Sequence, residues 1–247
     1  MVKNDNVLIS VVIPTKNEEK YLEKTLKQYS DIKDKFRMEV IISDGGSTDN
    51  TLKIARKYAD RLVVAKKGVK QNIAMGRNAG ASVARGYIIF NTDADVLIPH
   101  AERFFNHIIN LFKNNEVVAA TTKLKIYPSE ERLDDKIAHT LLNILIKTSN
   151  HFGSFLAKGE CQIVRASSFK KVGKYNEKIV LGEDCDLFFR LAKIGRIKYL
   201  KNLVIYHSPR RFRKEGYLKI FVFYALRDGV YLLFTGKSYV KEWKPIR

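Results

Sequence analysis

Two carboxylates stand two residues apart at the end of an apolar run in the first half of the chain. Asp93 and Asp95 follow the strand-like run Tyr87 to Asn91, so in extended backbone both acids could project to the same side. Hard divalent cations prefer carboxylate oxygens, and Mg²⁺ binds through one or two carboxylates plus the phosphates of a substrate. The pair therefore predicts a cation shared with a diphosphate, although most acidic pairs in loops are only solvated.

A second acidic pair, Glu183 and Asp184, precedes a stretch with helical periodicity. Its apolar residues are Leu187, Phe188, Leu191, Ala192 and Ile194. This pattern predicts an amphipathic helix with both acids near its N-terminus, where the helix dipole stabilises negative charge and keeps a carboxylate able to accept a proton. An N-capping role would account for only one of the two acids.

The chain is strongly basic, with 45 Lys and Arg residues against 26 Asp and Glu residues and a formal net charge of +19. Such an excess attracts polyanions of any kind, including nucleic acid, anionic lipid and phosphorylated substrates. The sequence contains no zinc-finger, RNA-recognition or basic-zipper signature, so a nucleic-acid-binding protein would rest on charge alone. We therefore expect no nucleic-acid partner.

Strand-length apolar runs alternate with helix-period stretches in the first half of the chain. The expected strands are Leu8 to Ile13, Val40 to Ser43, Leu62 to Ala65 and Tyr87 to Asn91. One expected helix carries Tyr21, Leu22, Thr25, Leu26 and Tyr29 on one face, and the next carries Leu52, Ala55 and Ala59. Alternation of this kind predicts an α/β fold with a parallel sheet covered by helices.

The polar motifs begin where these strands end. Pro14 and Thr15 follow the first strand, Asp44 the second and Asp93 the fourth. Parallel sheets bind ligands beyond the carboxyl ends of their strands. We therefore expect these residues to share one site at that edge of the sheet.

The second half of the chain continues the same pattern without a linker or repeat. We expect a helix over Phe104 to Phe112 and strands over Val117 to Thr122 and Gln162 to Arg165. A further helix between Asp134 and Phe152 carries Ile137, Leu141, Leu142, Ile144 and Leu145. We expect this apolar stripe to pack on the core, and the alternative is that it borders an acceptor groove.

Taken in order, the motifs resemble family 2 glycosyltransferases of the GT-A fold. They are Val11 to Glu18 (VVIPTKNE), Ile42 to Asp49 (ISDGGSTD), Gly76 to Gly80 (GRNAG), Asp93 to Asp95 (DAD) and Gly182 to Asp184 (GED). The resemblance runs from about Leu8 to about His207. It implies a Rossmann-like, mostly parallel sheet with helices on both faces, and inverting sugar transfer from a nucleotide-sugar with Mn²⁺ or Mg²⁺.

The resemblance assigns donor-binding roles residue by residue. The positions that match the nucleoside pocket of the family are Pro14, Thr15, Asn17, Glu18 and Asp44. Arg77 matches the basic residue that approaches the nucleotide or its diphosphate, and the alternative is an ordinary exposed helix arginine. Gly45 departs from the commoner DDGS pattern, so the donor base is less determined; we expect a UDP-sugar first and a GDP-sugar next.

The metal and the proton acceptor are assigned in the same way. Asp95 matches the more direct metal ligand, Asp93 is a second ligand or a contact to the donor's ribose or sugar, and His207 either completes the metal shell or has an ordinary polar role. Asp184, with Glu183 beside it, matches the general base that takes the proton of the acceptor hydroxyl. A polyprenyl phosphate acceptor, already anionic, would need no such base, and it remains the alternative.

A basic run follows His207 and contains Arg210 and Arg211, which could fold over the donor diphosphate. It stands where processive synthases of the family carry a motif with glutamine and tryptophan, and neither residue is present here, so polymer synthesis is disfavoured. A nucleotidyltransferase would instead need a glycine-rich phosphate loop after the first strand.

We divide the chain into a glycosyltransferase domain, residues 1–213, and a C-terminal segment, residues 214–247. The domain has a nucleotide-sugar half, 1–98, and an acceptor and catalytic half, 99–213. Aromatic and aliphatic residues from Tyr217 to Phe234 alternate with charges, which is typical of a basic amphipathic helix on a membrane surface. Packing of that segment on the core is the alternative.

Neither a signal peptide nor an apolar run long enough to span a bilayer occurs in the sequence. The only two cysteines, Cys161 and Cys185, lack a metal-binding spacing, which is typical of free thiols in a reducing compartment. We expect a cytoplasmic protein, peripheral on the cytoplasmic face of an anionic membrane, with a lipid-linked acceptor.

Overall fold

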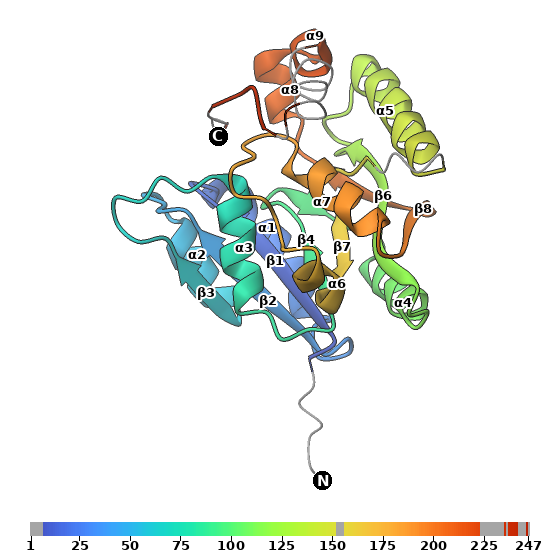
Figure 1. Ribbon diagram of the computed structural model, residues 1–247. Coiled ribbons are helices and arrows are strands. Elements are labelled where there is room, and N and C mark those ends of the chain that lie inside the picture. The colour runs from blue at the N-terminus through green and yellow to red at the C-terminus, as the bar shows by residue number, and fades with distance from the viewer. Residues whose placement is uncertain (1–6, 152–155, 223–234, 236, 242–245, 247) are drawn as a thin grey trace.

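The computed structural model describes residues 7–151, 156–222, 235, 237–241 and 246 (Figure 1). Within these residues, eight strands form one mixed sheet in the order β3-β2-β1-β4-β7-β6-β8-β5. The strands are β1 (Ile9–Thr15), β2 (Met38–Asp44), β3 (Arg61–Val64), β4 (Ile88–Asn91), β5 (Val96–Leu97), β6 (Val117–Ile126), β7 (Gln162–Arg165) and β8 (Arg196–His207).

The first four neighbours in the sheet, β3, β2, β1 and β4, are parallel. Their crossovers contain α1 (Glu19–Ser30), α2 (Thr51–Tyr58) and α3 (Ile73–Ser82). The register pairs Thr15 with Asp44, so β1 and β2 end level with one another. The predicted βαβ alternation of the first half is confirmed.

The other strands make the sheet mixed. β7 is antiparallel to both β4 and β6, whereas β8 is parallel to β6. The short strand β5 is antiparallel to β8 and places Val96 opposite His207. This last pairing brings the segment around Asp95 to the end of β8.

Helices cover both faces of the sheet, as predicted (Figure 1). The remaining helices are α4 (Ala101–Phe112), α5 (Leu133–His151), α6 (Ala166–Lys171), α7 (Glu183–Ala192), α8 (Arg210–Glu215) and α9 (Tyr217–Lys219). Alternate residues of β1 face opposite sides, so Val11 joins a core with α1, α2 and α4, while Val12 joins one with α3, α6 and α7. The strand ends are therefore held between two packed layers.

The expectation that α5 buries its whole apolar stripe in the core is wrong. Leu142 is buried, but Ile137, Leu141, Ile144 and Leu145 are each at least 50% exposed. The helix instead turns the row Ala138, Leu142 and Ile146 toward its neighbours β6 and β8. Two apolar rows lie side by side on this helix, and only tertiary packing selects the buried one.

The predicted C-terminal helix over Tyr217 to Phe234 falls mostly outside the described residues. The structure describes α9 at its start, and residues 223–234 lie beyond what it describes. In the described part of the chain, no helix is long and apolar enough to cross a membrane. Both cysteines are free, as expected.

Candidate active site

Asp44 ties the end of β2 to the end of β1. Its buried carboxylate accepts four hydrogen bonds, from Thr15 Oγ1 at 3.0 Å, Ser47 Oγ at 2.5 Å, Gly46 N at 2.9 Å and Ser47 N at 2.8 Å. An ionised carboxylate has about four lone-pair sites. The described contacts therefore use Asp44 first to hold the loop that follows β2.

The loop after β1 is tied to the same turn by Asn17, whose φ of 56° is in the left-handed region. Its backbone N–H donates to Ser47 Oγ at 2.8 Å, and its Oδ1 accepts from Thr48 N at 2.8 Å. The Glu18 N–H donates to Thr51 Oγ1 at 2.7 Å. The two loops predicted to surround a nucleoside are thus one hydrogen-bonded unit beside Pro14.

Arg77 of α3 lies at the centre of a charged cluster and is 2% exposed, so the alternative of an exposed helix arginine is excluded. One terminal nitrogen lies 2.5 Å from Glu183 Oε1, and the other lies 3.1 Å from Asp93 Oδ1 and donates to the Gly159 carbonyl at 3.0 Å. A Cβ at position 159 would stand 2.7 Å from that nitrogen, which explains the glycine there. Arg77 therefore joins the loop after β4 to the start of α7.

Glu183 and Asp184 occupy the first turn of α7, which begins after Gly182 with φ 87°. Glu183 is buried against Arg77, whereas Asp184 is half-buried and accepts from Cys185 N at 2.8 Å. Burial raises the pKa of both acids, and the Arg77 charge opposes the rise. Among the described residues Asp184 forms no ion pair, so its carboxylate is the less engaged of the two.

Arg210 of α8 connects Asp95 to Glu18. Its guanidinium donates to both Glu18 oxygens, at 2.7 and 3.0 Å, and its Nε lies 3.1 Å from Asp95 Oδ2. Burial raises the pKa of Asp95 to about 7, and Arg210 acts against that rise. Asp93 pairs with Arg77 instead, so the two acids of the pair face different cations.

His207 at the end of β8 is buried, and its Nδ1 is 3.7 Å from Glu160 Oε1. Its Nε2 is 3.0 Å from Nε2 of His139, whose Nδ1 is 3.0 Å from the Asp135 carbonyl oxygen. A carbonyl only accepts, so we assign the His139 proton to Nδ1, which makes His207 Nε2 the donor to His139. Burial lowers the pKa of both rings, and the neutral His207 keeps a lone pair on Nδ1.

The donor atoms near this point are of the types that bind Mn²⁺ or Mg²⁺. Asp93, Asp95 and Glu160 supply carboxylate oxygens, and His207 supplies an imidazole nitrogen. Within the described part of the chain, however, no three such side chains form a ready-made metal cluster. The donor chemistry fits a divalent cation whose shell is completed by substrate phosphate, in the way Mg²⁺ commonly binds.

Arg211, predicted to approach the diphosphate, contacts Glu215 at 3.0 Å within α8. Its neighbour Arg210 is the member of the basic run that pairs with Glu18 and Asp95. The predicted role of Arg211 stays a prediction.

The chain matches the family described as glycosyl transferase family 2 over residues 10–173. It belongs to this family. The match covers more than half of the chain and includes Asp44, Arg77, Asp93 and Asp95. The sequence motifs had predicted this family.

Two curated relatives match about four fifths of the chain. Chondroitin synthase of Pasteurella multocida is 27% identical over 207 residues, which are 80% of this chain and 20% of that protein. The succinoglycan biosynthesis protein ExoA of Rhizobium meliloti is 27% identical over 214 residues, 81% of this chain and 63% of that protein. The chain thus spans about a fifth of the first relative and under two thirds of the second.

Solved structures support the GT-A fold of this family member. The mannosyltransferase PcManGT from Pyrobaculum calidifontis, in complex with GDP-Man and Mn²⁺, superposes with a TM-score of 0.70 at 18% identity over 93% of this chain and 65% of that one. S. aureus TarS 1–349, in complex with UDP-GlcNAc, gives 0.61 at 20% identity over 81% and 58%. The predicted GT-A fold class is confirmed, and the C-terminal amphipathic helix stays a prediction.

Several residues in and around the candidate active site were not predicted from the sequence. They are His139, Gly159, Glu160 and Ser238; Ser238 Oγ accepts from the backbone of Val180 and Leu181 just before α7. His139 lies within the helix that was interpreted from its apolar stripe, and the other three carry no motif. They become visible only when the chain is folded, because each meets its partner over a long sequence separation.

Proposed function

We propose that this glycosyltransferase moves a sugar from a nucleoside-diphosphate sugar to an acceptor hydroxyl, with inversion at the anomeric carbon. The position of Asp184 supports this proposal most strongly. Asp184 is a half-buried acid that forms no ion pair with another described residue, and it lies next to Arg77, which pairs with Asp93 and Glu183. A base and a donor site side by side are what direct displacement needs.

The donor side uses the joined loops after β1 and β2. Pro14, Thr15, Asn17, Glu18 and Asp44 line the nucleoside, with UDP favoured and GDP next. Solved neighbours with this fold are complexes with GDP-Man or UDP-GlcNAc, which supports a nucleotide-sugar donor. Arg77, Arg210 and Arg211 supply guanidinium groups suited to phosphate oxygens.

Asp95, Asp93 and His207 would hold Mn²⁺ or Mg²⁺, which neutralises charge on the leaving diphosphate when bound. Complexes of similar fold with Mn²⁺ support this assignment. When the donor binds, Arg210 gives up part of its contact with Asp95 and contacts the donor phosphates instead. Glu18, bound through both oxygens, keeps the arginine at the site.

In the transfer step Asp184 removes the proton from the acceptor hydroxyl as its oxygen bonds to the anomeric carbon. The bond from that carbon to the diphosphate oxygen breaks on the opposite face, and inversion results. Glu183, fixed by Arg77, positions the first turn of α7 and with it Asp184. No covalent enzyme intermediate is required.

The acceptor is a hydroxyl of a lipid-linked glycan or glycolipid, and a polyprenyl phosphate is the alternative. The exposed apolar row of α5 and the exposed Leu218 of α9 support attachment to a membrane surface, and we assign it to the cytoplasmic face. Residues 1–98 serve the donor and 99–213 the acceptor in this proposal, with 214–247 at the membrane surface.

Thermal-shift measurements with UDP, GDP, CDP and dTDP, each with and without Mn²⁺, test the donor assignment. A ligand that binds the native state raises the apparent stability, so UDP with Mn²⁺ should raise the melting temperature most. An equal response to all four nucleotides would reject the preference for UDP. No response to any of them would reject a nucleotide-sugar donor.

A further inference from the structure

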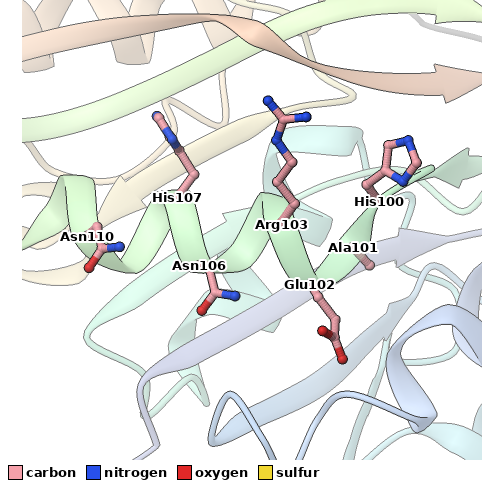
Figure 2. A pocket seen from close by; sticks show the side chains of 7 residues that line it. All are labelled: His100, Ala101, Glu102, Arg103, Asn106, His107 and Asn110. Atoms are coloured by element: carbon pink, nitrogen blue, oxygen red, sulfur yellow. The ribbon is translucent and has the colours of Figure 1, made fainter.

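A basic groove, defined by Arg103, Lys123, Lys125 and Lys201, lies between α4 and the β6-β8 pair. These cations line a hollow of about 360 Å³ together with Asn202, Leu203 and Val204. A wider hollow of about 700 Å³ adjoins it, shares Arg103 and continues along α4 (Figure 2). No carboxylate of the candidate active site lines either hollow.

The local structure explains why the cations gather there. His100, Arg103 and His107 are three and four residues apart, so they share one side of α4, while Phe104, Phe105 and Ile108 face the core. Figure 2 shows Arg103 and His107 pointing from α4 in the same direction. On the strands, the pairing of Thr122 with Leu200 jumps to Lys123 with Val204, which leaves Lys201 exposed in a bulge of β8.

The charge of the groove is not neutralised within the described chain. None of its four cations forms an ion pair or side-chain hydrogen bond with another described residue. The acid nearest in sequence to Arg103 is Glu102, which pairs with Lys35 at 2.8 Å. Clustered like charges in a concave surface focus a positive potential and attract an anionic partner.

The lining of the groove indicates which anionic partner fits. The described residues around it include no exposed large apolar side chain that could enter a bilayer, and no exposed aromatic ring that could stack on a nucleobase. Asn202 and His107 add side chains that donate to and accept from hydroxyl groups. Cations mixed with such neutral polar groups match a hydroxyl-rich chain that carries anionic groups.

We propose that the basic groove binds an anionic glycan, the phosphate-, carboxylate- or sulfate-bearing portion of the acceptor. The proposal rests on the proposed glycosyl transfer and names the chemical class of its acceptor. β6 and β8 connect the basic groove to the candidate active site. Lys123 of the groove is three residues before Ile126, which pairs with His207 of the active site. At the rise of a strand, this separation is about 10 Å.

The test compares two quadruple variants that lose the same charge. The groove variant carries Arg103→Gln, Lys123→Gln, Lys125→Gln and Lys201→Gln, and the control carries Lys170→Gln, Lys171→Gln, Lys174→Gln and Lys178→Gln, all exposed positions. The probe is a sulfated heparin octasaccharide in calorimetry at two salt concentrations. We expect the groove variant to bind roughly tenfold or more weakly with a smaller salt dependence, and the control to stay within about twofold.

Further binding measurements on the same two variants test the proposal. UDP binding with Mn²⁺ should be the same in both variants, which shows that they are folded and separates the groove from the donor site. If the groove variant bound the octasaccharide with parental affinity, or if the control variant lost as much affinity, the groove would be rejected as the binding site. Tighter groove-dependent binding of oligo-dT or of anionic vesicles would overturn the glycan as occupant. If the parental protein bound none of UDP, GDP, CDP and dTDP, the proposed function would be contradicted instead.

If the quadruple variant fails to fold, the pair Lys125→Gln and Lys201→Gln serves in its place, because both side chains are exposed. It should weaken octasaccharide binding by about threefold, against no change for Lys170→Gln with Lys171→Gln. An unchanged affinity in the first pair would also overturn the proposal.

Discussion

The loop pair, residues 14–18 and 44–51, differs from the charged seam formed by Arg77, Asp93, Asp95, Glu183 and Arg210. In the loop pair, the Asp44 carboxylate and several neutral groups hydrogen-bond to one another across two neighbouring loops. In the charged seam, ionised groups from α3, α7, α8 and the loop after β4 meet in pairs.

The difference in chemistry predicts a difference in behaviour. Hydrogen bonds between neutral groups each contribute about 1 kcal/mol, and those accepted by the Asp44 carboxylate contribute somewhat more. Together they fix the geometry of the loop pair, which is therefore a preorganised surface. Buried ion pairs offset a large desolvation cost and lose that compensation when one partner is removed. The charged seam can therefore exchange partners when a charged substrate binds, which suits it to chemistry.

The largest effect should come from Asp184→Asn at the charged seam. Because the amide cannot accept the proton, the rate of transfer should fall by about 10²- to 10⁴-fold while UDP binding stays unchanged. Turnover and calorimetric affinity are the two measurements. Asp186→Asn is the matched control, since Asp186 pairs with Arg190 in the same turn of α7; equal rates in the two variants would remove Asp184 from the mechanism.

Arg77→Met should cost the next largest amount, because it leaves Glu183 and Asp93 without their shared cation. We expect the free energy of unfolding in urea to drop by about 3–5 kcal/mol. Arg85→Met, which breaks a pair between Glu39 and an arginine side chain that is 56% exposed, should cost under about 1 kcal/mol. Similar losses of unfolding free energy in both variants would show that Arg77 stabilises the charged seam no more than Arg85 stabilises its exposed ion pair.

Asp44→Asn tests the loop pair. The amide places a donor where Gly46 N, Ser47 N and two hydroxyls now donate, so at least one buried group loses its partner at a cost of about 1–3 kcal/mol. Urea unfolding and UDP titration measure the result. The exposed Asp34→Asn should change neither, and an Asp44→Asn protein as stable as the parent would contradict the assigned role.

His139→Ala should weaken Mn²⁺ binding by about 10- to 100-fold, because His207 loses the acceptor that fixes its tautomer. Electron paramagnetic resonance of free Mn²⁺ gives the affinity without an activity assay. His139→Gln retains an acceptor oxygen and should recover part of the loss. Unchanged affinity in His139→Ala would separate His139 from the metal site.

The smallest effect concerns pH. Burial raises the pKa of Asp184 above the ordinary value of about 3.9, and the carboxylate is active only when deprotonated. Activity should therefore decline with falling pH at a higher pH than for an unperturbed aspartate. Arg77 lowers this pKa, so Arg77→Met should move the acidic limb of kcat/KM to still higher pH. A limb that stays in place would show that Arg77 does not act on Asp184.

Sequence patterns predicted the loop pair and the parallel half of the sheet because the determinants are local. Each strand end carries its own motif, and parallel strands bring their carboxyl ends to one edge. The charged seam was predicted as a set of residues but not as a set of partners. That Glu183 pairs with Arg77, and Arg210 with Glu18, depends on contacts over 106 and 192 residues.

The sequence by itself determined the family, the alternation of strands and helices, and the acids placed at strand and helix ends. Periodicity and motif spacing are properties of neighbouring residues, so no fold is needed to see them. Tertiary structure decided which apolar row of α5 is buried, which acid of the Glu183-Asp184 pair is engaged, and where the surplus positive charge gathers. Each of these depends on residues that lie across the sheet or beyond a crossover, and those residues come together only when the whole chain packs.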